Sequence, residues 1–207
     1  MEFKHEFIKI EKERFITFLD ALMAIIMTIM VLEIKIPDIE NLTDEALRHE
    51  LRKTVTPLIG FLVSFGTLVT IWISHHDLLK DIKGITKQFA LLNFIWIVTI
   101  ALLPFSTALG WGYSKTSLAV FIYAFNVFLV SVGFGVLHGF SVAKKLITVP
   151  HSQYNRAKLI VSFSGITLLV IAMLLAFTNH PGISLFLTAL IPLSHTILTI
   201  FAYKFKS

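Results

Sequence analysis

Residues 14–34 read RFITFLDALMAIIMTIMVLEI, an apolar run that is long enough to cross a membrane. About 20 mostly apolar residues span the hydrocarbon core of a bilayer as an α-helix. The run nevertheless opens with Arg14 and holds Asp20 inside it. A charge near the centre of a bilayer costs about 2.5–3.5 kcal/mol on insertion scales, so charged side chains there face protein or water. We therefore expect both residues to avoid lipid.

The composition of the whole chain is that of an integral membrane protein. Of its 207 residues 56% are hydrophobic and only 15% are charged, and the mean hydropathy is +0.80. A soluble domain of this size needs far more polar surface. The absence of cysteine excludes disulfides, cysteine-based zinc sites and thiol nucleophiles. The net charge of +5 does not indicate a nucleic-acid partner, because the position of charges in a membrane protein decides their role.

Six apolar runs predict an all-α integral membrane protein with six transmembrane helices, at 15–36, 56–79, 88–110, 117–143, 157–178 and 183–203. A short external helix is expected over 41–54, because Asn41 or Thr43 can cap it and its acids precede its bases. Lysine and arginine concentrate in the two chain ends and in the second-to-third and fourth-to-fifth loops. The positive-inside rule therefore puts both termini in the cytoplasm, with Trp111 and Tyr113 at the outer boundary.

One face of the first helix carries Ile25, Thr28 and Leu32 at the spacing i, i+3, i+7. Asp20 lies about 110° around the helix axis from this face, so we expect it against a neighbouring helix. The face fits either a packing seam between helices or the lining of a pore. Threonine is common at helix interfaces in membranes, and periodicity alone favours the seam.

The motifs of the first half of the chain resemble the transmembrane protein 175 family of potassium channels. The family signature is Arg, three residues and Phe-Ser-Asp, followed by an apolar run that ends near Leu-Glu. The corresponding residues here are Arg14, Phe18, Leu19, Asp20 and Glu33. The similarity continues in WISHHDLL (72–79) and LLNFIWIVTIALLPFSTALG (91–110), and it covers about residues 12–110. Leu19 departs from the family serine and removes a hydroxyl from the cytoplasmic-side network.

The resemblance implies a potassium-selective, leak-like channel of the prokaryotic type, a homotetramer whose first helices line a central pore. Ile25 would form the narrowest apolar ring, Leu32 another apolar ring, and Thr28 a hydroxyl layer. The sequence has no Thr-Val-Gly-Tyr-Gly filter. A cytoplasmic-side structural network would comprise Arg14, Phe18, Asp20, His75, His76 and Asn93. The implied setting is the lipid bilayer of a prokaryotic plasma membrane, with potassium among monovalent cations as the permeant ion and no cofactor.

Two other functions fit the sequence. A small proton-coupled transporter would use Asp20, His75 and His76 as a relay, and an accessory subunit would have no pore of its own. A carrier usually shows internal repeats and broken helices near the midplane. We see no repeat, and Pro104 stands without a neighbouring glycine. These observations favour the channel.

The remaining motifs carry less chemistry. Adjacent histidines point about 100° apart on a helix, which disfavours a metal site at His75 and His76 and favours hydrogen bonding or pH tuning. Gly135 and Gly139 form a small-xxx-small pair that favours close packing, within the chain or, less favoured, between subunits. The sequence has no Gly-x-Ser-x-Gly, His-Glu-x-x-His or phosphate-loop motif, so we expect no enzyme.

Overall fold

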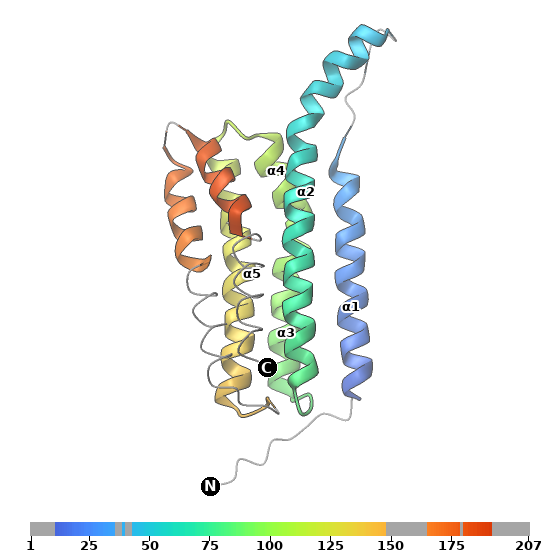
Figure 1. Cartoon of the computed structure of the whole chain (residues 1–207), viewed down its shortest axis with the longest axis vertical. Helices are drawn as coiled ribbons and strands as arrows, with labels where there is room; N and C mark the ends of the chain where they lie inside the picture. Colours follow the sequence, from blue (N-terminus) through green and yellow to red (C-terminus); the bar gives the residue numbers. More distant parts are fainter. Residues whose placement is uncertain (1–10, 36–38, 40–42, 148–164, 179, 192–207) are drawn as a thin grey trace, which may run out of the picture.

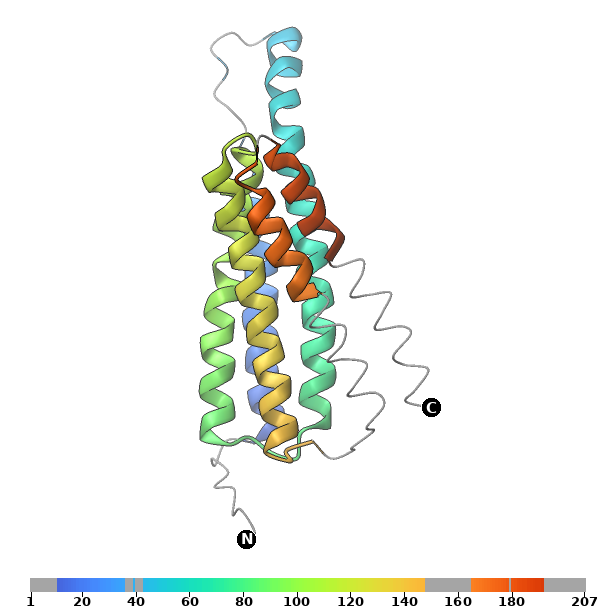
Figure 2. The same cartoon turned by 90° about the vertical axis from the view of Figure 1, so that its left-hand side faces the viewer.

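The computed structural model describes residues 11–35, 39, 43–147, 165–178 and 180–191, and these form an upright bundle of helices (Figures 1 and 2). The elements are α1 (Lys12–Ile29), the 3₁₀ helix η1 (Met30–Glu33), α2 (Asp44–Asp81), α3 (Lys87–Ala101), α4 (Leu103–Gly112) and α5 (Ser117–Ala143), followed by shorter helices at Gly165–Leu175 and Pro181–Ile191. Four stretches are long and apolar enough to cross a membrane: Lys12–Glu33, Asp44–Asp81, Lys87–Gly112 and Ser117–Ala143. The fifth and sixth expected spans fall partly outside the described residues.

The second span and the expected external helix are one element. Thr43 caps α2 by accepting a hydrogen bond from the backbone N–H of Ala46 at 3.2 Å, while Asn41 lies outside the described residues. From there α2 runs for 38 residues without a break, so a separate helix over 41–54 is a wrong prediction. Pro57 lies inside α2, where it removes one backbone N–H donor but leaves the helix intact.

The third expected span is interrupted. α3 ends at Ala101 and α4 begins at Leu103, so the span expected over 88–110 is present as Lys87–Gly112, with a break in the helix at Leu102. Pro104 supplies the cause, because it has no N–H to donate and its ring crowds the carbonyl one turn earlier. The amide of Asn126 on α5 donates to the carbonyl of Thr99 at 2.9 Å and so satisfies a backbone group beside the break.

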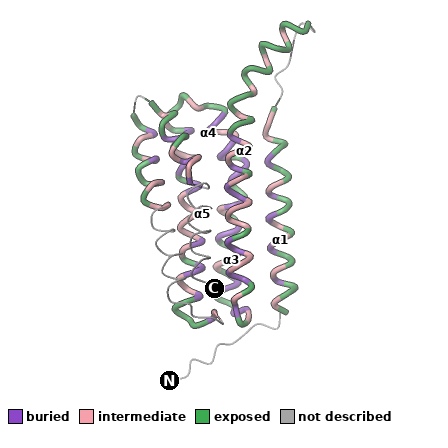
Figure 3. Tube along the Cα trace, viewed as in Figure 1, coloured by how far each residue is buried: buried purple, intermediate pink, exposed green. Residues whose placement is uncertain are grey.

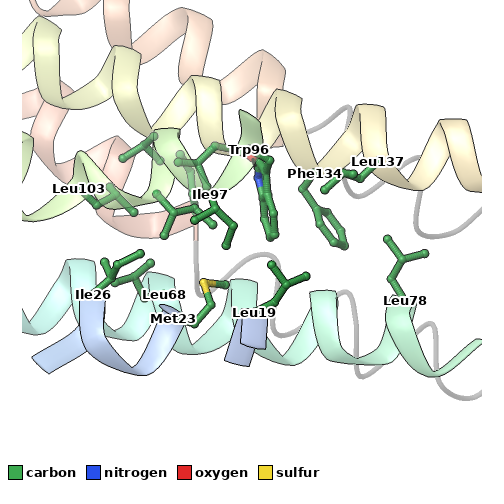
Figure 4. Packing of buried hydrophobic residues seen from close by; sticks show 14 of the residues in the cluster. Leu19, Met23, Ile26, Leu68, Leu78, Trp96, Ile97, Leu103, Phe134 and Leu137 are labelled. Atoms are coloured by element: carbon green, nitrogen blue, oxygen red, sulfur yellow. Dashed lines mark hydrogen bonds between the residues drawn. The ribbon is translucent and has the colours of Figure 1, made fainter. Parts of the chain in front are cut away.

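Trp96 joins α3 to α5 at the centre of the bundle. Its indole N–H donates to the carbonyl of Val130 at 2.8 Å, and its ring lies against Gly133 and Phe134. Figure 4 shows Trp96 and Phe134 side by side, above the buried side chains of α1 and α2. A Cβ at position 133 would come within 2.4 Å of the Trp96 ring, so this close approach requires glycine.

Gly133→Ala is expected to destabilise the protein by about 1–3 kcal/mol, because overpacking forces the indole and its hydrogen bond to shift. Thermal unfolding in detergent measures the effect. Gly135→Ala is the matched control, since no described atom lies within 4 Å of a Cβ there. The same finding holds at Gly139, so the expected within-chain packing of this glycine pair is not seen among the described residues. Equal unfolding temperatures for the two variants would contradict the close approach.

Basic residues gather at one end of the bundle, where α1 begins and α5 ends (Figure 1). The Lys12 ammonium donates to the carbonyl of Lys80 at 2.8 Å, and the backbone N–H of Lys83 donates to the carbonyl of Leu146 at 2.8 Å. Lys145 turns the chain after α5 with a φ of 53°. Segments far apart in the sequence thus meet at this end, where the acids Glu13 and Asp81 lie among the lysines.

Candidate functional site

α1 has two faces of different character (Figure 3). The inner face packs into the bundle through Phe15, Leu19, Met23 and Ile26, and Met30 continues it into η1. Their spacing of four, four, three and four residues is that of one helix face. Leu19 is 0% exposed, so an apolar core contact fills the position where the resemblance implies a serine.

The outer face of α1 carries the predicted stripe. Ile25 is 53% exposed and Leu32 is 72% exposed, and Thr28 between them is exposed as well. The stripe therefore is not a packing seam between described helices of this chain. A large apolar face on a membrane helix is left for lipid, for another subunit, or for a pore that several subunits enclose.

Thr28 presents its oxygen outward. Its hydroxyl donates to the carbonyl of Ile25, one turn earlier, at 2.8 Å. A threonine hydroxyl has one proton to donate and two lone pairs that accept. Because the proton is engaged with the backbone, the lone pairs are available to a cation or to water on the exposed face.

Asp20 lies against α2, at about 110° from the stripe. The indole N–H of Trp72 donates to its carboxylate at 2.9 Å, and Nδ1 of His76 lies 3.7 Å from the other carboxylate oxygen. The rings of Trp72 and His76 stack with centroids 5.5 Å apart. The carboxylate thus ties α1 to α2 through a hydrogen bond and a nearby imidazole.

His75 points to α3 rather than to α1. Its Nε2 lies 2.8 Å from the Asn93 carbonyl oxygen, which only accepts, so the hydrogen bond assigns the proton to Nε2. The Asn93 amide in turn donates to the carbonyl of Phe89 at 2.7 Å, and both side chains are fully buried. The His75 ring packs on Trp96 at 4.6 Å. The two neighbouring histidines therefore brace α2 against different helices.

The other two predicted network residues lie apart from the carboxylate. Phe18 is half exposed and contacts the ring of Phe94 on α3 edge-on at 6.2 Å. Arg14 is exposed and makes no hydrogen bond or ion pair within the part of the chain that the structure describes. It lies on the outer face, at the basic end of the bundle. The structure therefore brings together Asp20, His75, His76 and Asn93 near α2, and leaves Arg14 outside.

Trp72 is the network residue that sequence reasoning missed. It belongs to the motif WISHHDLL but was assigned no partner, because the register between α1 and α2 decides which residue reaches Asp20. Its position one turn before His76 was the available signal, since residues four apart share a helix face. A tryptophan among polar residues in a membrane span also needs a partner for its N–H.

No cluster of three or more histidine or carboxylate residues that could hold a metal ion occurs among the residues that the structure describes.

A second buried polar cluster lies further along the bundle. The Thr107 hydroxyl donates to Ser64, whose oxygen lies 2.9 Å from the Tyr123 hydroxyl, and Ser106 donates to Asn126 at 2.7 Å. These contacts join α2, α4 and α5 near the junction of α3 and α4.

Fold and site together define a multi-span helical membrane protein whose first helix presents an apolar, hydroxyl-bearing face outward. The family model described as "Endosomal/lysosomal potassium channel TMEM175" matches residues 14–104. The resemblance to the transmembrane protein 175 family is thereby confirmed over the region that holds α1, α2 and α3. The family is one of ion channels, in agreement with the expectation that the chain is no enzyme.

Relatives and a solved structure agree with the family match. A potassium channel of Chamaesiphon minutus is 29% identical over 99 residues, which cover 48% of this chain and 49% of that protein. The endosomal/lysosomal proton channel TMEM175 of Mus musculus is 30% identical over 122 residues, which cover 58% of this chain and 23% of that protein. The chain thus spans half or less of these relatives. The crystal structure of a lysosomal potassium-selective channel TMEM175 homolog from Chamaesiphon minutus shares the fold, with a TM-score of 0.81 at 21% identity, covering 91% of this chain and 97% of that one.

Proposed function

We propose that this protein is a potassium channel in which several copies, four by the family resemblance, set their α1 helices around a central pathway. The observation that carries this proposal is the outer face of α1. Ile25, Thr28 and Leu32 are exposed, although they continue an apolar helix whose other face is fully packed. A pathway lined by this face needs a ring of copies, since one chain contributes one α1.

The chemistry of the pathway follows from the order of the exposed residues. A ring of Ile25 side chains offers no ligand to an ion and excludes water at its narrowest, which makes it a gate. Thr28, one turn further along, offers hydroxyl oxygens whose protons are held by the backbone. Potassium sheds its water more readily than sodium, so partial dehydration at these layers favours potassium. No cofactor takes part.

Thr28→Ala is expected to lower the potassium-to-sodium permeability ratio several-fold, because the hydroxyl layer no longer replaces water around the ion. Thr28→Ser keeps a hydroxyl and should keep most of the preference. Reversal potentials under a potassium–sodium gradient measure both variants. An unchanged ratio in Thr28→Ala would rule out the hydroxyl's part in selectivity.

The half-buried contacts of Asp20 and the buried contact of His75 support a bracing role. Asp20 is held by Trp72 and His76, and His75 by Asn93, so α1, α2 and α3 are joined behind the pathway. Arg14 lies on the outer face at the mouth of the pathway, and Phe18 seals α1 on Phe94. By the positive-inside rule this basic end is cytoplasmic, in a prokaryotic plasma membrane.

A proton-coupled transporter is the second candidate, favoured by two observations. Asp20 lies beside His76 at 3.7 Å, and the helix break at Leu102 is a feature that carriers often have. Purified protein in liposomes separates the two functions. Potassium-driven flux that follows the potassium gradient, exceeds sodium flux and needs no proton gradient supports the channel. Saturable transport that stops when the proton gradient is removed supports the carrier.

A further inference from the structure

The first turn of α1 carries two opposite charges on adjacent residues, Glu13 and Arg14. Figure 1 shows α1 at one edge of the bundle, so its outer side is open to a neighbouring molecule. Both residues are exposed, and neither has an ion pair within the part of the chain that the structure describes. Lys12 is engaged with α2 instead, through the carbonyl of Lys80. The two charges are therefore available to groups outside their own chain.

Arg14 lies on the side of α1 that faces the proposed pathway. It precedes Ile25 by eleven residues, about three full turns of an α-helix, so both residues lie on the same side of α1. In a ring of copies, Arg14 therefore stands at the cytoplasmic mouth of the pathway. Rings of arginine favour anions, and an uncompensated positive ring repels cations. A potassium pathway is therefore expected to hold a negative group beside Arg14.

Glu13 lies about 100° around the helix axis from Arg14, on a flank of α1 that faces the next copy in a ring. Ala24 lies on the same flank about three turns further along, and it is exposed too. Adjacent residues differ by only about 1.5 Å along the helix, and rotation about the pathway axis preserves height. Glu13 of one copy is therefore level with Arg14 of the next, and Ala24 with Ile25. The small side chain of Ala24 lets the copies approach closely at the level of the constriction.

Glu11 is the other acid near Arg14. It is the N-cap residue of α1, one turn before Arg14 in the same chain, and it is exposed. The two residues form no ion pair, so this carboxylate does not neutralise Arg14 within the described part of the chain. Glu13 of the next copy is the acid whose height and direction match.

We propose that the carboxylate of Glu13 pairs with the guanidinium of Arg14 on the next copy, and that a closed ring of such pairs joins the copies at the mouth of the pathway. The partner is a second copy of this chain. The inference rests on the proposed function, because it needs copies that set α1 around a common axis. The ring of ion pairs links the copies and cancels the positive charge that would otherwise repel potassium.

Opposite charge changes in separate copies test the ring of ion pairs. Glu13→Arg makes both positions basic and Arg14→Glu makes both acidic, so either variant alone brings like charges together. Copies of the two kinds that alternate around a ring restore every pair. When full-length copies are expressed together, tagged Glu13→Arg should retain at least about threefold more untagged Arg14→Glu than untagged Glu13→Arg. An ion pair inside one chain cannot produce this preference.

Glu11→Arg is the matched control, because it makes the same change of charge one turn earlier. Tagged Glu11→Arg should show no preference for Arg14→Glu, since its own copies keep the pair of Glu13 with Arg14. An equal preference in this control would overturn the ring of ion pairs, because it indicates a general attraction between oppositely charged copies. Tagged and untagged parent copies keep the two proposals distinct. Parent copies that co-purify, with no preference among the variants, would overturn the ring of ion pairs and leave the channel standing. Parent copies that do not co-purify would contradict both.

Neutral variants test the same pair without like charges. Glu13→Gln and Arg14→Gln should each lower the temperature at which the oligomer dissociates in detergent. The double variant should lose no more than either single variant, because all three lack the same ion pair. Losses that add up in the double variant would show that the two residues act independently and would overturn the ring of ion pairs.

Discussion

Ile25→Ala is expected to raise potassium flux through the reconstituted protein by about tenfold or more, the effect of lowering a barrier by ~1.4 kcal/mol. In the proposed pathway, water is excluded where the isoleucine side chains are closest. Shortening one side chain in every copy widens the ring at a single level, so the ring becomes wet and ions pass. Because the Ile25 side chain is 53% exposed, its truncation leaves no large cavity inside its own chain, and the fold should tolerate the change.

The matched control is Ile95→Ala on α3. Ile95 is 57% exposed, so it is the same residue type with a similar exposure, but it lies on a different helix. We expect its flux to equal that of the parent. Fluorescence-based flux in liposomes, at matched protein content, measures both variants. Similar increases in both would point to general loosening of the protein and would contradict a gate at Ile25.

Asp20→Ala is expected to damage assembly or gating before it alters ion preference. The substitution removes the acceptor of the Trp72 indole N–H, a part-buried hydrogen bond, which costs about 1 kcal/mol. It also removes the carboxylate that faces His76 at 3.7 Å. The hydrogen bond from Lys12 to the carbonyl of Lys80 and the apolar contacts then remain to hold α1 to α2. Size-exclusion profiles, thermal unfolding and reversal potentials measure the three consequences.

Asp20→Asn separates the hydrogen bond from the charge. The amide oxygen can still accept from Trp72, so we expect stability closer to that of the parent than in Asp20→Ala. A bracing role predicts unchanged potassium preference in both variants wherever the protein assembles. A shift of ion preference in a normally assembled Asp20→Ala channel would mean that the carboxylate meets the ion, and the bracing role would be wrong.

The sequence predicted the faces of α1 because a single helix has a fixed period. One face of the helix holds Ile25, Thr28 and Leu32 wherever the neighbouring helices lie, and the structure leaves that face exposed. Asp20 was expected against another helix by the same geometry. The sequence does not predict that its partner is Trp72. That pairing depends on the axial register of α1 and α2, which no local pattern records.

Capping residues and prolines predicted the helix ends only in part. Thr43 and the acids after it predicted a helix start correctly, but not that the helix would continue through Pro57 into the span. Proline removes one backbone hydrogen bond, and α2 continues through Pro57 in spite of that loss, so proline is not a certain helix boundary. Pro104 broke its helix instead, where Asn126 on α5 could satisfy the carbonyl of Thr99. Only tertiary contacts distinguish these two prolines.

The most direct test of the account is whether the outer face of α1 lines a water-filled pathway. Leu32→Cys and Val98→Cys place single thiols at exposed positions on α1 and α3, in a chain without other cysteines. A charged, water-soluble thiol reagent added to liposomes should block most potassium flux through Leu32→Cys and leave Val98→Cys unchanged. Full flux through Leu32→Cys after its modification would contradict a pore lined by α1.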